Sequence, residues 1–392
     1  MNIKMFKNLN RNLVFLFALN VAFGLTMQLI NPLFPLFLEE AGANEVQNAM
    51  VISAGNLVAT MLMLPSGLLI DRVGKKTLLL FGAGLSTVSI FLLSMVNSWV
   101  TVFPLYLLFS MAGAFFIPSR MAMITENTTS LNRSSTFGVM NMAWPVTGII
   151  APTLSGFLIE HFNWRLVFLI AGGINALSLI PTYMIKRKGA NKTKTEKASF
   201  RDVFKPEVFP VLASFFVFHL FMTTGLGGVN MILPLYLGDV HGLTPTLIGI
   251  FFTAPSIVMM FTQVPAGALA QRFGKKRWIL SCIVMIPFLY FSWMFTENWV
   301  VMLIAYSLLF GLWSMTWPAT LTLLSESVPD EMLGAAFGVR MTGVRMGFTA
   351  GPLIGSYLYG TYYPSSPFLG AAVFTLLAVI IAYTLRDTVR EV

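Results

Sequence analysis

Charged residues are scarce in this chain of 392 residues, at only 10% of the total. Soluble domains carry about 25% charged residues. Hydrophobic residues make up 56% of the chain, and the mean hydropathy is +0.77. A soluble core of this length cannot enclose so much apolar surface. The composition therefore excludes a soluble protein and predicts a chain embedded in lipid.

Cysteine and histidine are nearly absent as well. The single Cys282 excludes a disulfide framework and a cysteine metal cluster. His161, His219 and His241 are too widely spaced for a zinc site. The sequence has no Gly-x-x-x-x-Gly-Lys-Ser/Thr phosphate loop, which argues against an ATP-driven pump. Because it also offers no catalytic pair and no sizeable polar domain for a sensor, we expect no metal, no cofactor and no enzymatic activity.

Twelve apolar stretches are long enough to cross a bilayer, because a spanning helix needs about 20 mostly apolar residues. Pro and Gly interrupt several of them, which membrane helices tolerate better than soluble ones. The pattern predicts an all-α integral membrane protein. The expected spans cover roughly residues 12–38, 46–70, 77–96, 100–125, 135–159, 165–185, 208–237, 245–270, 278–296, 299–325, 334–358 and 366–385.

Lysine and arginine are distributed unevenly between the predicted loops. With the N-terminus inside, the outside loops hold only Arg165 among the basic residues and carry acids instead. This asymmetry predicts a multi-pass protein of the cell membrane with both termini in the cytoplasm. It also explains the net charge of +9 without a nucleic-acid partner.

A charged turn with two glycines occurs twice, 200 residues apart, as Gly-Leu-Leu-Ile-Asp-Arg-Val-Gly-Lys-Lys at 67–76 and Gly-Ala-Leu-Ala-Gln-Arg-Phe-Gly-Lys-Lys at 267–276. Further pairs share this offset, and Asn31 and Asn230 match at 199 residues. The chain is therefore a duplication. We expect two pseudo-symmetric six-helix bundles, 1–185 and 208–392, joined by a cytoplasmic linker at 186–207, with a site near the middle of the membrane. The further pairs are Pro65 with Pro265, Pro118 with Pro318, Glu126 with Glu326, and Pro152 with Pro352.

At these turns the chain resembles the major facilitator superfamily, whose signature between helices 2 and 3 reads Gly-x-Leu-Ala-Asp-Arg-x-Gly-Arg/Lys-Arg/Lys. Residues 67–76 fit closely, and the second copy has Gln271 in place of the acid. The resemblance covers essentially the whole chain and implies a secondary active transporter that works by alternating access. It also implies a cytoplasmic gate formed by Gly67, Asp71, Arg72, Gly74, Lys75, Lys76, Glu126, Gly267, Arg272, Gly274 and Glu326.

Within this gate the resemblance implies that Arg72 reaches Glu126 and that Arg272 reaches Glu326 by symmetry. Asp71 is expected to face the N-terminal end of helix 11, where the helix dipole favours an anion. The alternative is that the basic residues only anchor the turns on the inside of the membrane.

A looser resemblance lies in helix 5, where residues 148–156 read Gly-Ile-Ile-Ala-Pro-Thr-Leu-Ser-Gly. The exporter branch of the family carries a glycine-rich pattern here that ends Gly-Pro-x-x-Gly-Gly. Ala151 and Ser155 replace two of its glycines. The resemblance favours export of drug-like or metabolite molecules, with ordinary packing of small residues between helices as the alternative.

Polar and aromatic residues within the spans are the candidates for substrate contact, because polar side chains avoid acyl chains. Hydrogen bonding between helices is the alternative role. Arg345 lies about 16 Å from the start of its span, near mid-membrane. Arg340 is expected nearer the surface, snorkelling or paired with Asp71, and Arg120 in a structural ion pair. The candidates are Asn20, Asn31, Asn141, Trp144, His219, Asn230, Gln263, Trp317 and Arg345.

Carboxylates are missing from the middle of every predicted span. A buried carboxylate is the usual partner of a cationic drug, so the census makes an anionic or neutral substrate physically easier. Two hypotheses result: ion-driven efflux of drug-like molecules, and uptake or exchange of a small organic anion with Arg345 as the anion contact. We expect a monomer in the lipid bilayer with a small-molecule substrate and a coupling ion, most simply a proton.

Overall fold

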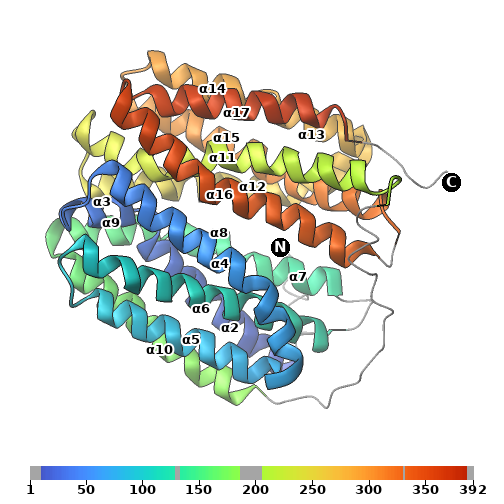
Figure 1. The fold of residues 1–392 in the computed structure, drawn as a ribbon, viewed down its shortest axis with the longest axis horizontal. Helices are drawn as coiled ribbons and strands as arrows, with labels where there is room; N and C mark the ends of the chain where they lie inside the picture. Colours follow the sequence, from blue (N-terminus) through green and yellow to red (C-terminus); the bar gives the residue numbers. More distant parts are fainter. Residues whose placement is uncertain (1–9, 129–132, 186–204, 330–331, 386–392) are drawn as a thin grey trace. The chain divides into compact units, whose positions relative to one another are not determined.

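The computed structural model describes residues 10–128, 133–185, 205–329 and 332–385. Within these ranges the regular elements are all helices (Figure 1). Each predicted span corresponds to one helix or to a short series of helices. The first six spans are α2 (Arg11–Ile30) with α3 (Phe34–Glu40), α4 (Glu45–Val73), α5 (Lys75–Leu93), α6 (Trp99–Glu126), the series α7 (Arg133–Asn141), α8 (Ala143–Gly148) and α9 (Ala151–His161), and α10 (Trp164–Met184).

The second six spans repeat this order. Ten helical segments of the described chain are long and apolar enough to cross a membrane. The segment 366–382 is apolar but has 17 residues, and the 29-residue segment 333–361 carries Arg340 and Arg345. The predicted all-α membrane fold is confirmed. The elements are α11 (Phe209–Asp239), α12 (Pro245–Phe273), α13 (Lys275–Ile283) with α14 (Ile286–Ser292) and η2 (Trp293–Phe295), α15 (Trp299–Glu326), α16 (Leu333–Thr361) and α17 (Ser366–Ala382).

Prolines at equivalent positions act differently in the two repeats. The first span breaks after Ile30 and restarts as α3 with Pro35 in its first turn, and Pro152 likewise lies in the first turn of α9. In the second repeat, α11 and α16 continue through Pro234 and Pro352. A proline in the first turn loses no helical hydrogen bond, whereas one inside a helix does. The sequence repeat therefore does not extend to every helix break.

The chain forms two compact units. The first holds residues 1–44, 54–191 and 244–253, and the second holds 45–53, 192–243 and 254–392. In the first unit α10 packs on α2 and α5, and α5 packs on α6; in the second, α11 packs on α16 and α17. The bundle boundaries 1–185 and 208–392 stay a prediction. The compact units differ from them, because residues 45–53 at the start of α4 group with the second unit and residues 244–253 at the start of α12 group with the first. Most of the linker 186–207 lies outside the described residues.

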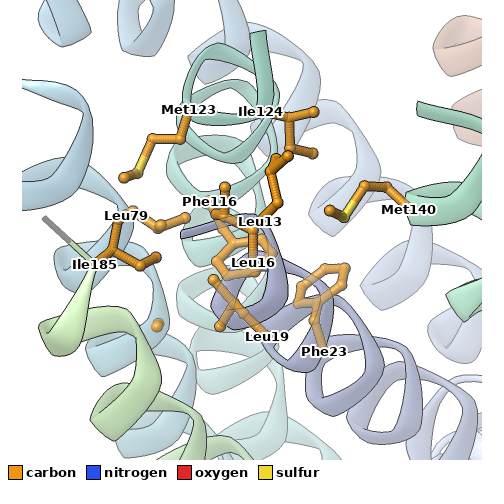
Figure 2. Close-up of a cluster of buried hydrophobic side chains, with 11 residues drawn as sticks. Leu13, Leu16, Leu19, Phe23, Leu79, Phe116, Met123, Ile124, Met140 and Ile185 are labelled. Atoms are coloured by element: carbon orange, nitrogen blue, oxygen red, sulfur yellow. The ribbon is translucent and has the colours of Figure 1, made fainter. Parts of the chain in front are cut away.

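Each unit has a close-packed interior. In the first, Leu16 and Phe23 of α2 meet Leu79 of α5 and Phe116 of α6 in a buried apolar cluster (Figure 2). The ring centroids of Phe23 and Phe116 lie 4.4 Å apart in a stack.

In the second unit the contact between α11 and α16 is made by glycines. A Cβ added to Gly351 would lie 2.5 Å from the carbonyl oxygen of Thr224, and one added to Gly343 would lie 2.5 Å from that of Phe216. The two helices therefore approach at a distance that only glycine permits.

Candidate substrate site and cytoplasmic turns

The two repeated turns depend on a glycine with positive φ. Gly74 has φ of 94° and Gly274 has φ of 85°, and each immediately precedes a helix, α5 or α13. Other residues pay a steric cost in this region. By contrast, Gly67 and Gly267 lie inside helices, and a Cβ added to either would meet nothing within 4 Å. Within the described units, the second glycine of each turn is the one that the backbone requires.

The acids at the ends of α6 and α15 pair with lysines. Lys75 donates to Glu126 at 3.0 Å, and Lys275 pairs with Glu326. The predicted pairing of these acids with arginines is wrong. Arg72 is exposed, while the guanidinium of Arg272 lies 5.6 Å from the ring centroid of Phe273. The lysines, and not the arginines, pair with the acids because each lysine is the first residue of the helix after the glycine. The arginines belong to the helix before the glycine.

The contacts of the neighbouring lysines, Lys76 and Lys276, are also the same in the two units. Lys76 donates to the backbone oxygen of Tyr183 at the end of α10. Lys276 donates to the backbone oxygen of Tyr383, just after α17, at 2.8 Å. Each lysine ties the start of one span to the end of another within its own unit. The side chain of Asp71, the remaining residue of the predicted gate, lies outside the described part of the structure.

In the first unit an arginine and two residues of other helices form a polar group. Arg120 of α6 donates from Nη1 to Oδ1 of Asn20 on α2 at 2.7 Å. Asn20 donates in turn to the backbone oxygen of Met140 on α7 at 3.3 Å. Arg120 Nε is buried and has no hydrogen-bond partner among the described residues. The expected ion pair of Arg120 is thus wrong among the described side chains, where its partner is a neutral amide.

In the second unit Arg340 of α16 is fully buried, at 2% exposure. Its Nε donates to Nε2 of His219 on α11 at 3.0 Å, and its guanidinium lies 4.7 Å from the ring centroid of Trp317 on α15. His219 Nδ1 lies 2.8 Å from the backbone oxygen of Phe215. These contacts fit a neutral imidazole that carries its proton on Nδ1 and accepts on Nε2. The expectation that Arg340 snorkels is therefore wrong.

The two polar groups occupy equivalent positions of the repeat. Asn20 corresponds to His219 at the offset of 199 residues that also relates Asn31 to Asn230. The arginines do not correspond to each other. Thr320 stands at the position equivalent to Arg120, and Met140 at the one equivalent to Arg340. Each unit thus places one arginine against the same position of its first helix, but from a different neighbouring helix.

The other predicted contact residues lie in varied surroundings. Asn230 accepts a hydrogen bond from the Tyr306 hydroxyl at 2.8 Å. Asn31 is exposed and lies 3.4 Å from the sulfur of Met27. The structure brings His219 and Trp317 together through Arg340 and leaves the rest of the set scattered. Asn141 and Trp144 are exposed, and Gln263 and Arg345 are half-buried.

Sequence reasoning missed Arg340 as the centre of the group in the second unit, and Arg120 as the arginine in the first. The signal that was available is the offset of the repeat. Carrying Asn20 forward by 199 residues leads to His219, and an arginine near each points to related polar groups.

The sequence pattern of the Major Facilitator Superfamily matches residues 16–244 and 216–392, which together cover nearly the whole chain. The protein belongs to this superfamily. As a member, it is a multi-pass membrane transporter, and its two pattern matches agree with the duplication seen in its turns.

Curated relatives of this superfamily match over almost the full length. Multidrug resistance protein MdtG of Klebsiella pneumoniae (strain 342) is 26% identical over 380 residues, which are 94% of this chain and 92% of the relative. Multidrug resistance protein 1 of Bacillus subtilis (strain 168) is 26% identical over 352 residues, 88% of this chain and 89% of that protein.

Solved structures of the superfamily share the fold. A bacterial homologue of the human lysosomal transporter Spinster, in an inward-facing and occupied conformation, aligns with a TM-score of 0.79 at 14% identity, covering 95% of each chain. A mutant of the nucleoside transporter NupG aligns with a TM-score of 0.77 at 14% identity, covering 96% of this chain and 99% of that one. At this identity the likeness concerns the fold alone.

Proposed function

We propose that this protein exports small drug-like or metabolite molecules by alternating access, driven by an ion gradient. The observation that carries the proposal is the match, over about nine-tenths of the chain, to bacterial proteins named for multidrug resistance. The looser exporter pattern around Pro152 agrees with it. In this proposal both termini face the cytoplasm, the protein acts as a monomer and the coupling ion is a proton.

The contacts at the turns suit a protein whose units move as bodies. The pair Lys75–Glu126 and the bond from Lys76 to Tyr183 join α5 to α6 and to α10 within the first unit. The second unit repeats them with Lys275 and Lys276. Such contacts keep the helix ends of each unit together during a rocking motion, as alternating access requires.

Accumulation of a fluorescent drug in cells tests the proposed direction. Cells that express the protein should hold less ethidium than cells with an empty vector, and a protonophore should abolish the difference. Arg277→Gln serves as a matched control, because Arg277 is exposed and lies outside both the predicted gate and the candidate substrate contacts. Higher accumulation in expressing cells would refute export.

A second function, uptake or exchange of an organic anion, is favoured by the charges of the spans. The described helices hold acids only near their ends, while Arg120, Arg340 and Arg345 lie well inside α6 and α16. A charge inside the membrane is costly unless it has a role or a partner. Uptake of a labelled organic anion by proteoliposomes would favour this function, and export of cations unaffected by anions would exclude it.

A further inference from the structure

We propose that Arg120 and Asn20 form a binding site for an oxyanion, such as a carboxylate or sulfonate, carried by an amphiphilic small molecule. The proposal rests on the proposed transport function and names a chemical group of the substrate. It differs from the sequence-based expectation, which assigned the anion contact to Arg345.

Among the described residues, the guanidinium of Arg120 is not fully satisfied. Arginine has five N–H donors and carries its charge at any physiological pH. Among the described residues, Nη1 has Oδ1 of Asn20 as its acceptor, and Nε is buried without one. An unpaired donor on a buried cation costs more than one on a neutral group. A bound oxyanion would supply both the missing acceptor and the missing negative charge.

Asn20 is held in one orientation. Its Nδ2 points to the backbone oxygen of Met140 at 3.3 Å, so its Oδ1 is turned toward Arg120. Asn20 is 3% exposed and cannot turn freely. The amide therefore fixes one edge of the guanidinium and leaves the Nε edge to a ligand. This preorganisation lowers the entropic cost of binding.

Apolar side chains share the helix faces that carry Asn20 and Arg120. Phe23 lies three residues after Asn20 on α2, and Phe116 lies four residues before Arg120 on α6, so each shares a helix face with its polar neighbour. The two rings stack at 4.4 Å, and they belong to the same buried apolar cluster as Met140 (Figure 2). Apolar side chains on the same helix faces as the cation suit a ligand with an anionic head and an apolar body.

The second unit provides the contrast. Arg340 has an acceptor for its Nε in His219 and an aromatic ring next to its guanidinium in Trp317. The protein itself therefore supplies both partners of the Arg340 guanidinium, and Arg340 is only 2% exposed. Arg120 is half-buried, and within the described part of the chain its Nε has no acceptor. The anion site therefore belongs to the first unit.

The test uses the purified full-length protein in phosphatidylcholine nanodiscs and two ligands of the same shape. These are 4-phenylbutyrate and its neutral amide, 4-phenylbutyramide, with binding measured by calorimetry. We expect the carboxylate to bind about tenfold or more tightly than the amide, as a charge-assisted hydrogen bond implies. Arg120→Gln should reduce this preference to about threefold or less.

Asn20→Asp is the decisive second variant, because it keeps Arg120 and gives it an internal carboxylate at nearly the same place. It should abolish the preference for the carboxylate while raising the Tm. Should Arg120→Gln fail to fold, Asn20→Asp decides alone. Arg277→Gln changes an exposed arginine outside every candidate site, so it is the matched control and should keep the wild-type preference. Arg345→Gln tests the competing anion contact, and it should also keep the preference.

An unchanged preference in Asn20→Asp, or no preference in the wild type, overturns the proposal. Loss of the preference in Arg345→Gln alone would return the anion contact to Arg345. Nanodiscs with phosphatidylglycerol distinguish a lipid source: competition with 4-phenylbutyrate there would show that a phosphate headgroup reaches the same site. Because binding is measured without a gradient, failure of export in cells leaves this result standing.

Discussion

Asn20 and His219 lie 199 residues apart in the chain, and each accepts a hydrogen bond from an arginine of a neighbouring helix in its own unit. The acceptor is an amide oxygen in one unit and an imidazole nitrogen in the other. Neither is an acid, so in both units a buried cation is held by a neutral group. This arrangement makes the two positions sensitive to substitution in ways that differ between the units.

Replacement of His219 by Leu removes the acceptor of the Arg340 Nε and leaves a buried cation. We expect a loss of about 2–4 kcal/mol in the free energy of unfolding, because the donor keeps its desolvation cost. The double variant His219→Leu with Arg340→Met should be more stable than His219→Leu alone. Thermal unfolding of the wild type, His219→Leu, Arg340→Met and the double variant in detergent gives the coupling energy. Additive losses of stability would show that the two side chains do not interact.

The glycine-lined contact of α11 with α16 predicts a second loss. Gly351→Ala places a Cβ against the carbonyl oxygen of Thr224, and the backbone cannot yield easily. We expect destabilisation by about 2 kcal/mol or more. Gly338→Ala on the same helix is the control, since its Cβ would meet no described atom within 4 Å. Equal unfolding temperatures of the two variants would contradict the close approach.

The positive φ of Gly74 predicts a third loss of stability on substitution. Gly74→Ala should destabilise by about 1 kcal/mol, because alanine is strained in this backbone region. Gly84→Ala inside α5 should instead stabilise by about 0.5–1 kcal/mol through helix propensity, as its site is open. A denaturant titration that ranks the pair in the opposite order would refute the account of the turn.

The lysine–acid pairs predict a small effect at the turns. Glu126→Gln should cost about 0.5–1 kcal/mol, a modest value because Lys75 is 37% exposed and solvent screens the pair. Arg72→Gln should be close to neutral, since Arg72 is exposed and Glu126 has another partner. Stability measured at low and high salt checks both, and a larger effect at Arg72 would restore the pairing expected from the sequence.

His241, in the loop between α11 and α12, predicts a pH dependence of stability. Burial lowers the pKa of His241, and the nearby Glu297 raises it by a smaller amount. Since the folded pKa lies below the unfolded value, the unfolded state takes up the proton first as the pH falls. Stability is therefore complete above the unfolded pKa, about 6.5, and is lost as the pH falls from there through the folded pKa.

His241→Gln should lose less stability than the wild type between about pH 7 and pH 5, a window that begins near the unfolded histidine pKa. The control is His161→Gln, which changes an exposed histidine at the end of α9. Unfolding temperatures that fall in parallel for the wild type and His241→Gln would assign the acid sensitivity to other groups.

The helices and their order could be predicted from the sequence, because hydropathy determines which segments enter lipid. The partners of Glu126 could not. Whether Arg72 or Lys75 reaches that acid depends on the turn at Gly74, which separates the last turn of α4 from the first turn of α5. A charge pattern alone does not contain that geometry.

The burial of Arg340 could not be predicted either. Counting residues from the helix start gives its depth along the helix axis but not which neighbour it faces. Only the glycine-mediated approach of α11 to α16 brings His219 within reach of its Nε. Polarity alone makes Gln263 and Asn141 candidates, and in the described structure neither joins the two arginine groups.

The arginine lies on α6 in one unit and on α16 in the other, and this difference indicates that the two repeats have diverged since the duplication. If the two repeats were once identical, at least one substitution has occurred at the pair Arg120 and Thr320, and at least one more at the pair Met140 and Arg340. The lysine contacts of the turns show no such divergence. A chain assembled from two first repeats would keep those turns and the fold, yet it would carry a second unsatisfied guanidinium in place of the one that histidine now holds.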